Sequence, residues 1–483
     1  MEFSNSYTTI GTAFFKSVPP EPVKDPKLFL WNSRLAEELQ LGETGELPSE
    51  ELIDALSGNT LLPGSEPVAL AYAGHQFGNF VPQLGDGRAH LLGEIVDQSG
   101  ERRDVQLKGS GPTPFSRSGD GRYALGPAIR EFVMGEAIHA LGIPTTRSLA
   151  VTTTGEIVFR ETAQQGAVLT RIAASHLRVG SFEYFAARQN LQALEQLCDY
   201  AILRHYPELQ EHGEERFLLL LEKVMKRQID LVVEWMRVGF IHGVMNTDNT
   251  AISGETIDYG PCAMMGTYDP NTVFSSIDRQ GRYAFANQPS IAQWNMARFA
   301  ESLLPLIDND EKNAIDKAGA CLETFSALFK DRYHQMMARK IGISQTSSSD
   351  QLLISSLLDK LKSGRLDYTD SFHRLTLSFT SPVVERALQG ELTDWYDDWR
   401  ARLQQQPVDI DPEVVMKGAN PVVIPRNRHM EQVIQSCTQQ GDASAAEDFL
   451  DVLLSPYQLT EKTHSYQKSS ADEDLGYRTF CGT

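Results

Sequence analysis

The sequence predicts an α+β protein with two lobes, a small strand-rich lobe followed by a larger helical lobe. Residues 66–165 contain two β-hairpin patterns with one amphipathic helix between them, and helical patterns dominate from about residue 166 onward. Because strand and helix periodicities are segregated along the chain, they indicate separate layers rather than alternating βα units. A length of 483 residues suffices for such a two-lobed body with extensions at both ends.

The first two parts of the chain are an extension and the small lobe. Residues 1–65 are rich in proline with short helical pieces, and we expect an N-terminal extension packed on the main body. In the small lobe, 66–165, "AHLLGEIVD" and "RDVQLKGS" flank the turn signal "QSGER". "LAVTTTGEIVFRET" predicts a second hairpin that turns at Thr154-Gly155. Between the hairpins, "GPAIREFVMGEAIHALGIP" predicts a helix that ends near Gly142.

The helical lobe occupies the rest of the chain. We expect residues 166–300 to carry the catalytic and metal-binding loops, and 301–483 to form its helical C-terminal part with a cysteine-bearing tail. The clearest helix is "RFLLLLEKVMKRQIDLVVEWMRVGF", which leads directly into His242. No apolar run is long enough to span a bilayer. The helices show no distinctive dimer seam, and we expect a monomer.

Composition excludes several classes of function. With 44 basic and 64 acidic residues, the net charge of −20 argues against broad binding to nucleic acids or anionic membranes. A nucleotide needs only a local cluster of basic groups and is not excluded. The five cysteines are widely spaced, which argues against a zinc site or a disulfide framework. The N-terminal stretch lacks the pattern of a secretory signal, and we expect a cytoplasmic protein.

The stretch "HGVMNTDNTAISGETIDYG", residues 242–260, is similar to the catalytic core of a protein kinase with one residue replaced. A kinase has H-R-D-L-x-x-x-N followed by D-F-G. His242 and Asn249 keep that spacing and Asp258 begins a D-Y-G, but Val244 stands where the catalytic Asp belongs. Asp248, Asn249 and Asp258 offer hard oxygen ligands that suit Mg²⁺ or Mn²⁺ held together with phosphates. "NTDNT" is equally typical of a structural turn.

Other short stretches carry groups that suit a nucleotide. Glycines let the backbone approach phosphates, and lysine and arginine bind them. A kinase strand lysine also pairs with a helix glutamate, for which both Glu131 and Glu136 are available. Arg171 and Arg178 are seven residues apart, or about two helical turns. Taken alone, each stretch is also typical of a surface turn, an edge lysine or solvated arginines. The candidate residues are Gly85, Gly87, Arg88, Lys108, Asp120, Gly121, Arg171 and Arg178.

Taken together, these stretches resemble the selenoprotein O family, called YdiU in bacteria. The similarity covers nearly the whole chain and includes "AYAGHQFGNFVPQLGDGRA", "LKGSGPTPFSRSGDGR", "ASHLRVGSFEYFA", "GFIHGVMNTDNT" and "FANQPSIAQWNMARFAE". The resemblance implies a protein-kinase-like fold in which ATP lies flipped relative to kinases. It also implies transfer of AMP to Ser, Thr or Tyr hydroxyls of proteins, with Mg²⁺ or Mn²⁺. UTP use, which gives UMPylation, is attributed to bacterial members.

The resemblance also implies a role for each candidate. Lys108 would be the nucleotide lysine with Glu131 as its partner, and Asn249 and Asp258 would bind the metal. Asp248 would be the general base. The nucleotide site would further contain Gly85, Gly87, Arg88, Asp120, Gly121, Arg171, Arg178 and Asp258. Cys481 lies in the region where some relatives carry selenocysteine, which implies a redox role by analogy, with Cys262 as one candidate partner.

Two other functions remain open. One is an ordinary kinase-like phosphotransferase acting on a small molecule, with Asp248 in place of the missing base. The other is a non-catalytic pseudokinase that binds nucleotide and scaffolds partners, which Val244 favours. The joint presence of Lys108, Asn249 and Asp258 argues against a mere scaffold.

Overall fold

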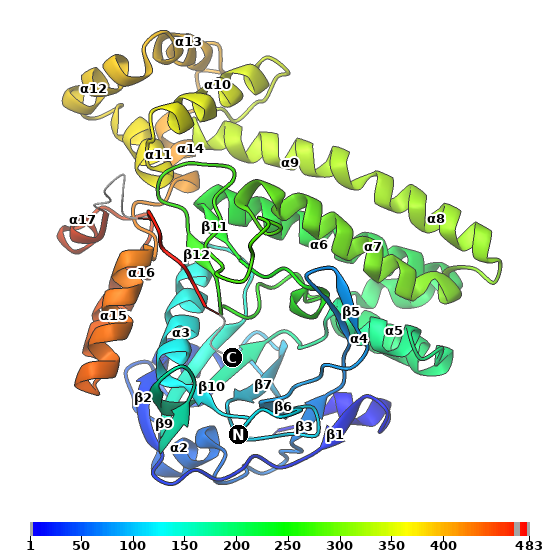
Figure 1. Ribbon diagram of the computed structural model, residues 1–483. Coiled ribbons are helices and arrows are strands. Elements are labelled where there is room, and N and C mark those ends of the chain that lie inside the picture. The colour runs from blue at the N-terminus through cyan, green and yellow to red at the C-terminus, as the bar shows by residue number, and fades with distance from the viewer. Residues whose placement is uncertain (1–2, 468–473, 481–483) are drawn as a thin grey trace.

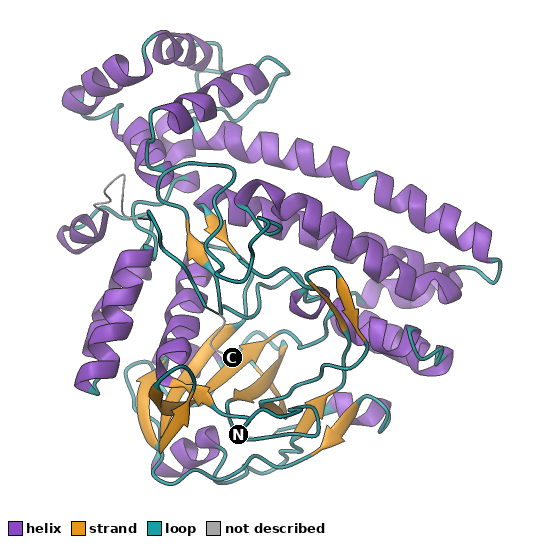
Figure 2. Ribbon diagram, in the orientation of Figure 1, coloured by secondary structure: helices purple, strands orange, loops and turns teal. Residues whose placement is uncertain are grey.

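Strands gather in one lobe of the structure and helices in the other (Figure 1). The computed structural model describes residues 3–467 and 474–480 of the 483-residue chain. Figure 2 shows most of the strands below the long helices, with shorter helices beside the sheet. The predicted α+β class and its order along the chain are confirmed.

The main sheet has eight strands, and its strand pairs are antiparallel. Along the sheet the strands are β1 (Phe15–Ser17), β3 (Val68–Leu70), β6 (Ala89–Val96), β7 (Arg102–Lys108), β10 (Ala163–Ala173), β9 (Arg147–Phe159) and β2 (Lys27–Trp31), with β8 (Tyr123–Ala124) paired to β10. The N-terminal extension supplies β1 at one edge and β2 at the other. It therefore completes the sheet instead of only packing against it.

The second hairpin turns later than the sequence predicted. β9 continues through Thr154-Gly155, and its register with β10 shifts there, while the chain reverses at residues 160–162. Gly155 has a φ of +68°, so the Thr-Gly pair forms a bulge within the strand rather than a turn. β10 likewise runs to Ala173, which extends the strand-rich region beyond residue 165.

One helix of the small lobe, α3 (Leu125–Ala140), matches the predicted helix closely. It packs on β9 and β10 and also contacts two helices from the far end of the chain, α15 (Asn427–Gln440) and α16 (Ser444–Leu453). Because it is covered on both sides, most of its residues are buried, including both candidate glutamates. The remaining helices of the N-terminal region are α1 (Ser33–Glu38), α2 (Glu50–Ser57) and the 3₁₀-helix η1 (Ser6–Ile10).

The helical lobe is built around α6 (Arg216–Val238), which lies against α7 (Gln288–Ile307) and α9 (Phe325–Lys340) (Figure 1). Its other helices are α4 (Val179–Ala186), α5 (Leu191–His205), η2 (Pro207–Glu215), η3 (Thr247–Asn249), η4 (Phe285–Asn287), α8 (Glu311–Glu323), α10 (Asp350–Ser363), α11 (Tyr368–Leu377), α12 (Pro382–Leu392), α13 (Asp394–Leu403), α14 (Pro412–Ala419) and α17 (Glu461–Gln467). Two small sheets complete the fold: β4 (Gly74–Gln76) with β5 (Asn79–Val81), and β11 (Phe240–Ile241) with β12 (Ala263–Met264).

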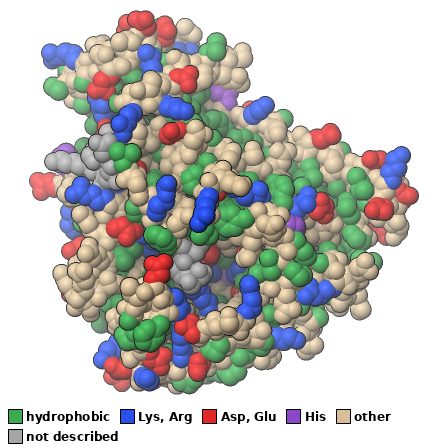
Figure 3. All heavy atoms as spheres, viewed as in Figure 1, with side chains coloured by type: hydrophobic (Ala, Val, Ile, Leu, Met, Phe, Trp, Pro, Cys, Tyr) green, Lys and Arg blue, Asp and Glu red, His purple; other side chains and the backbone are tan. Residues whose placement is uncertain are grey.

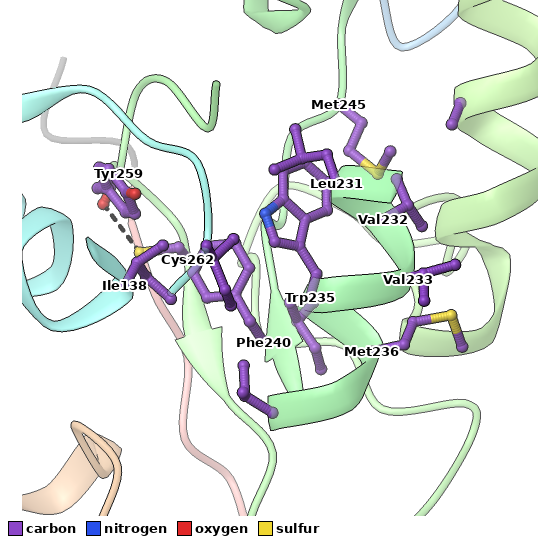
Figure 4. Close-up of a cluster of buried hydrophobic side chains, with 14 of the residues drawn as sticks. Ile138, Leu231, Val232, Val233, Trp235, Met236, Phe240, Met245, Tyr259 and Cys262 are labelled. Carbon is purple, nitrogen blue, oxygen red and sulfur yellow. Dashed lines mark hydrogen bonds between the residues drawn. The ribbon is translucent and has the colours of Figure 1, made fainter. Parts of the chain in front are cut away.

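A buried cluster supports the stretch that the sequence singled out. Trp235 of α6 packs against Phe240, with ring centroids 5.6 Å apart, and Tyr259 and Cys262 lie on the other side of Phe240 (Figure 4). The indole of Trp235 donates a hydrogen bond to Thr256 Oγ1 at 2.8 Å. The core thus fixes both ends of the loop 242–260.

The same hydrophobic core continues through both lobes and therefore marks no boundary between domains. The predicted division of the chain into 1–65, 66–165, 166–300 and 301–483 stays a prediction.

The surface carries both charges. On the face seen in Figure 3, acidic and basic side chains are interspersed, without a continuous basic band over the part of the chain that the structure describes. Within residues 3–467 and 474–480, the structure contains no helix with the length and apolar character of a membrane span.

Candidate nucleotide-binding and catalytic site

A pocket of about 660 Å³ opens where the strands of the small lobe meet the loop 242–260. Residues from both lobes line it, and the predicted set is concentrated there. From that set it is lined by Gly85, Gly87, Arg88, Lys108, Asp120, Gly121, Arg171, Arg178, Asp248, Asn249 and Asp258. Glu131 lies directly behind Lys108, while Cys481 falls outside the described residues.

Lys108, at the end of β7, joins the two lobes through its ammonium group. Its Nζ donates to Glu131 Oε2 at 2.7 Å and to Asp258 Oδ1 at 2.5 Å. The other oxygen of Glu131 accepts from Arg171 Nε at 2.9 Å. Arg171, Glu131, Lys108 and Asp258 therefore form a chain of alternating charges. The geometry selects Glu131 as the contact of the lysine, because Glu136 is held by Arg147 of β9.

This network sets the charge of both carboxyl groups. Burial acts to raise the pKa of Glu131, but Arg171 and Lys108 outweigh it and hold the pKa below its usual value. Burial likewise acts to raise the pKa of Asp258, and Lys108 and Arg171 hold that pKa far below its usual range. Both groups are ionised at neutral pH. Asp258 also has a φ of +70°, an uncommon backbone conformation that is frequent at functional sites.

The end of the pocket around Arg178 contains a second network. Arg178 lies over the ring of Tyr72 at 4.5 Å, and its guanidinium is 3.6 Å from Asp86 Oδ1. Asp86 Oδ2 accepts from Gln106 Nε2 at 3.1 Å, and Gln106 in turn accepts from Arg171 at 3.3 Å. Two buried guanidinium groups thus point to a polyanionic ligand at this end.

The predicted helical spacing of the two arginines is wrong. Arg171 belongs to β10, and Arg178 precedes the first residue of α4. They meet because β10 ends between them and the chain turns into α4.

Sequence reasoning missed three residues of this end: Tyr72, Asp86 and Gln106. Gln106 could have been found, because it lies two residues before Lys108 on a strand and therefore on the same face. Asp86 stands between Gly85 and Gly87, which were both predicted to line the nucleotide site. Tyr72 carries no comparable signal.

The loop 242–260 places Asn249 and Asp248 at the pocket. His242 donates from Nε2 to the carbonyl of Ile257 at 2.9 Å, so it holds backbone rather than a ligand. Asn249 donates from Nδ2 to the carbonyl of Val244 at 3.1 Å, which leaves its side-chain oxygen available. Asp248 is 8% exposed, and within the described residues its Oδ1 is buried with no hydrogen-bond partner. Burial raises the pKa of Asp248 to about 6.

Two neighbouring elements hold this loop from behind. Thr247 Oγ1 donates to Glu183 Oε2 of α4 at 2.6 Å and accepts from the backbone N–H of His75 at 2.7 Å. The imidazole Nδ1 of His75 lies 2.5 Å from the other oxygen of Glu183. Gln76 then reaches Asp248 Oδ2 with its Nε2 at 3.5 Å. The β4–β5 hairpin and α4 therefore fix the position of Asp248.

Gly74 is the closest point between the hairpin and Asp248. A Cβ at this residue would lie 2.5 Å from Asp248 Oδ1 and 2.9 Å from its Cβ. We expect Gly74→Ala to lower turnover by about a hundredfold, because the Asp248 carboxylate must move by a sizeable fraction of an ångström. Nucleotide affinity, measured by calorimetry, should stay close to that of the unchanged protein. Gly319→Ala is the control, since it adds a methyl group in open space. Wild-type turnover in Gly74→Ala would show that the position of Asp248 does not matter.

Four cysteines lie in the described part of the chain, Cys198, Cys262, Cys321 and Cys437, and all are free thiols. Cys262 is buried and donates to the carbonyl of Tyr259 at 3.3 Å (Figure 4). Burial raises the pKa of Cys262 to about 12, so it is a poor thiolate. Thr479 donates to the carbonyl of Pro261 at 2.6 Å, which brings the tail against the segment after Asp258. The redox role of Cys481 stays a prediction.

The pocket combines what a nucleotide reaction needs. Buried arginines and a lysine suit phosphates, and an ionised carboxylate with a nearby amide oxygen suits a divalent metal. Two protein ligands are enough when phosphate oxygens and water complete the coordination of Mg²⁺. The carboxylate of Asp248 lines the pocket and can accept a proton from a hydroxyl.

Comparisons with known proteins find matches that cover most or all of this chain. A family model described as "Protein adenylyltransferase SelO" matches residues 1–454. A "Protein nucleotidyltransferase YdiU" of Teredinibacter turnerae is 54% identical over 486 residues, covering 100% of both chains. Proteins of the same name from Anoxybacillus flavithermus and Bradyrhizobium sp. are 53% identical over 487 residues and 51% identical over 490 residues, each covering 100% of this chain and 99% of the relative.

Proposed function

Because this chain belongs to the SelO family of protein adenylyltransferases, we propose that it transfers AMP from ATP to Ser, Thr or Tyr hydroxyls of other proteins. Membership of this family makes it an enzyme, a protein nucleotidyltransferase. UTP would serve as a second nucleotide and give UMP transfer. The fold that we propose is protein-kinase-like, with the nucleotide between the small and the helical lobe. The proposal includes a cytoplasmic monomer, which free cysteines in the described residues suit.

One observation carries the proposal: the carboxylate of Asp248, not a residue at the position of Val244, meets the pocket. Asp248 lines the pocket, its Oδ1 has no hydrogen-bond partner among the described residues, and it lies on the loop that also bears Asn249. A kinase keeps its base at the position of Val244, where this chain has no proton acceptor. With ATP flipped, as the resemblance to the family implies, the base need not stand where a kinase keeps it, and Asp248 can serve attack on the α-phosphorus.

The residues of the site would have three separate roles in the reaction. Asn249 and Asp258 would hold Mg²⁺ or Mn²⁺, which supplies positive charge to the phosphates when bound. Lys108, Arg171 and Arg178 would bind the triphosphate and stabilise the charge that grows on the leaving pyrophosphate. Asp248 would accept the proton of the attacking hydroxyl as the new phosphoester bond forms and the α–β bond breaks.

Replacement of Asp248 by asparagine tests the base directly. We expect turnover to fall by about a hundredfold or more, because an amide of the same shape cannot accept the hydroxyl proton. The dissociation constant of ATP should change little, since Asp248 contacts no phosphate-binding cation through its carboxylate. Transfer rates and calorimetric titrations check both expectations. Nearly unchanged turnover would remove Asp248 as the base.

Labelled ATP distinguishes the proposed function from its alternatives. The protein is incubated with Mg²⁺ or Mn²⁺ and with ATP labelled at either the α or the γ phosphate, and label in protein and in small molecules is followed. Protein label from the α position alone supports AMP transfer. Label from the γ position alone would mean a kinase-like phosphotransferase. Bound nucleotide without any transfer would mean a pseudokinase scaffold.

A further inference from the structure

The β4–β5 hairpin connects the base to an outer surface. Gln76 reaches Asp248, and two residues later the tip of the hairpin contacts a side chain of the helical lobe. A Cβ at Gly78 would lie 3.6 Å from the guanidinium of Arg282. On the opposite strand, Phe80 is 40% exposed and lies 5.0 Å from the ring of His75. None of Gly78, Phe80 and Arg282 lines the nucleotide pocket, so this surface is separate from the phosphate-binding residues.

Arg282 is held in place by aromatic rings. Its guanidinium lies 4.9 Å from the Trp294 ring and 5.7 Å from the Tyr283 ring. Tyr283 donates to Asn246 Oδ1 at 2.7 Å, two residues before Asp248. Stacking on rings orients the planar guanidinium without neutralising its charge. The position of Arg282 is therefore tied to the same loop as the base.

Arg282 has no carboxylate partner within salt-bridge distance among the residues that the structure describes. The nearest acid on its own loop, Asp278, accepts the backbone N–H groups of Arg282 and Tyr283 instead. By contrast Arg298, which also lies 4.9 Å from the Trp294 ring, forms an ion pair with Glu301. Arg282 therefore keeps a positive charge near the catalytic loop in a chain whose net charge is −20.

We propose that Arg282 is the docking point for an acidic side chain of the acceptor protein, a few residues from the hydroxyl that is modified. This inference rests on the proposed function and names its acceptor class: hydroxyl residues flanked by Asp or Glu. A guanidinium group pairs with a carboxylate through two hydrogen bonds in a fixed geometry, and stacking on Trp294 orients the guanidinium group of Arg282 for such a pair. The triphosphate has cations of its own in Lys108, Arg171 and Arg178, so Arg282 is not needed for the nucleotide. A local positive charge on an acidic protein also selects which partners approach.

The test compares two synthetic peptides of equal length, each with one serine, flanked by Asp residues in one and by Lys residues in the other. With ATP labelled at the α phosphate, the unchanged enzyme should have about fivefold higher kcat/KM for the acidic peptide, as for a partly exposed ion pair. Arg282→Glu should abolish or reverse this preference and leave ATP affinity unchanged. Arg279→Glu makes the same charge change at an exposed residue of the same loop and should keep the preference.

The outcomes separate the two proposals. Equal labelling of both peptides by the unchanged enzyme would overturn the docking role of Arg282 while leaving nucleotidyl transfer intact. The same preference in Arg282→Glu as in the unchanged enzyme would also overturn it. Absence of α label from both peptides and from every protein acceptor, with ATP still bound, would overturn both proposals. A preference that is lost or reversed in Arg282→Glu but kept in Arg279→Glu supports the inference, and loss in both variants would overturn it.

Discussion

Replacing Asp258 by asparagine is expected to lower the rate of nucleotidyl transfer by about a thousandfold or more. Asparagine keeps the shape of the side chain and removes its charge. Asp258 is an ionised carboxylate 2.5 Å from Lys108 Nζ and the proposed metal ligand, and its low pKa keeps it charged throughout the neutral range. Loss of this charge weakens metal binding and also frees Lys108 from one of its two carboxylates.

Metal titration distinguishes these two causes. Transfer is measured over a range of Mn²⁺ concentrations, and recovery at high Mn²⁺ would identify metal affinity as the main loss. Asp97→Asn is a suitable control, because Asp97 is also a carboxylate paired with an arginine, Arg103 at 2.8 Å, and does not line the pocket. Full activity of Asp258→Asn without added metal would contradict a role for Asp258 in holding it.

Replacing Glu131 by alanine is expected to lower the free energy of unfolding by about 3 kcal/mol. Glu131 is 2% exposed and balances both Arg171 and Lys108, so its removal leaves buried positive charge behind. Asp258 lies 3.5 Å from Arg171 and limits the loss. Denaturation in urea, followed by circular dichroism, measures the change. Transfer should also fall sharply at temperatures where the variant is folded, because Lys108 loses its anchor.

Glu136→Ala provides the matched comparison on the same helix. Glu136 is equally buried, and it binds Arg147 and the backbone N–H of Ser148 rather than Lys108. We expect this variant to lose stability and to keep transfer. Equal loss of transfer in both folded variants would mean that the pairing with Lys108 has no special importance.

The sequence predicted the class of fold and the lobe order because periodicity is a property of local segments. α3 was predicted within a few residues, since its apolar spacing and terminal glycine are local signals. The turn of the second hairpin was placed wrongly because Thr154-Gly155 has the composition of a turn, whereas the true reversal at 160–162 contains neither Gly nor Pro. The choice between strand bulge and turn depends on the register of the partner strand, which no local pattern specifies.

The residues that line the candidate pocket were predictable where the residue type itself indicates a chemical role, as a charged side chain does. Lys108 and Asp258 carry charges in a known spacing, and both line the pocket. Glu131 and Glu136 could not be separated by pattern, because the answer depends on Arg147, which only the packing of β9 brings to Glu136. Arg282 gave no signal, since its proposed role depends on Trp294 and on the β4–β5 hairpin, which packing brings to it.

The two edge strands of the sheet have a consequence for how the protein is made. β2 is synthesised early, yet its partner β9 follows late: Lys27 accepts a hydrogen bond from Thr153, 126 residues further along. During translation β2 must therefore wait unpaired until most of the small lobe has left the ribosome, whereas β1 can pair with β3 much sooner. Such long-range pairing slows folding and leaves strand edges exposed in the meantime. β2 is thus the strand of the finished sheet whose edge stays open longest in the newborn chain.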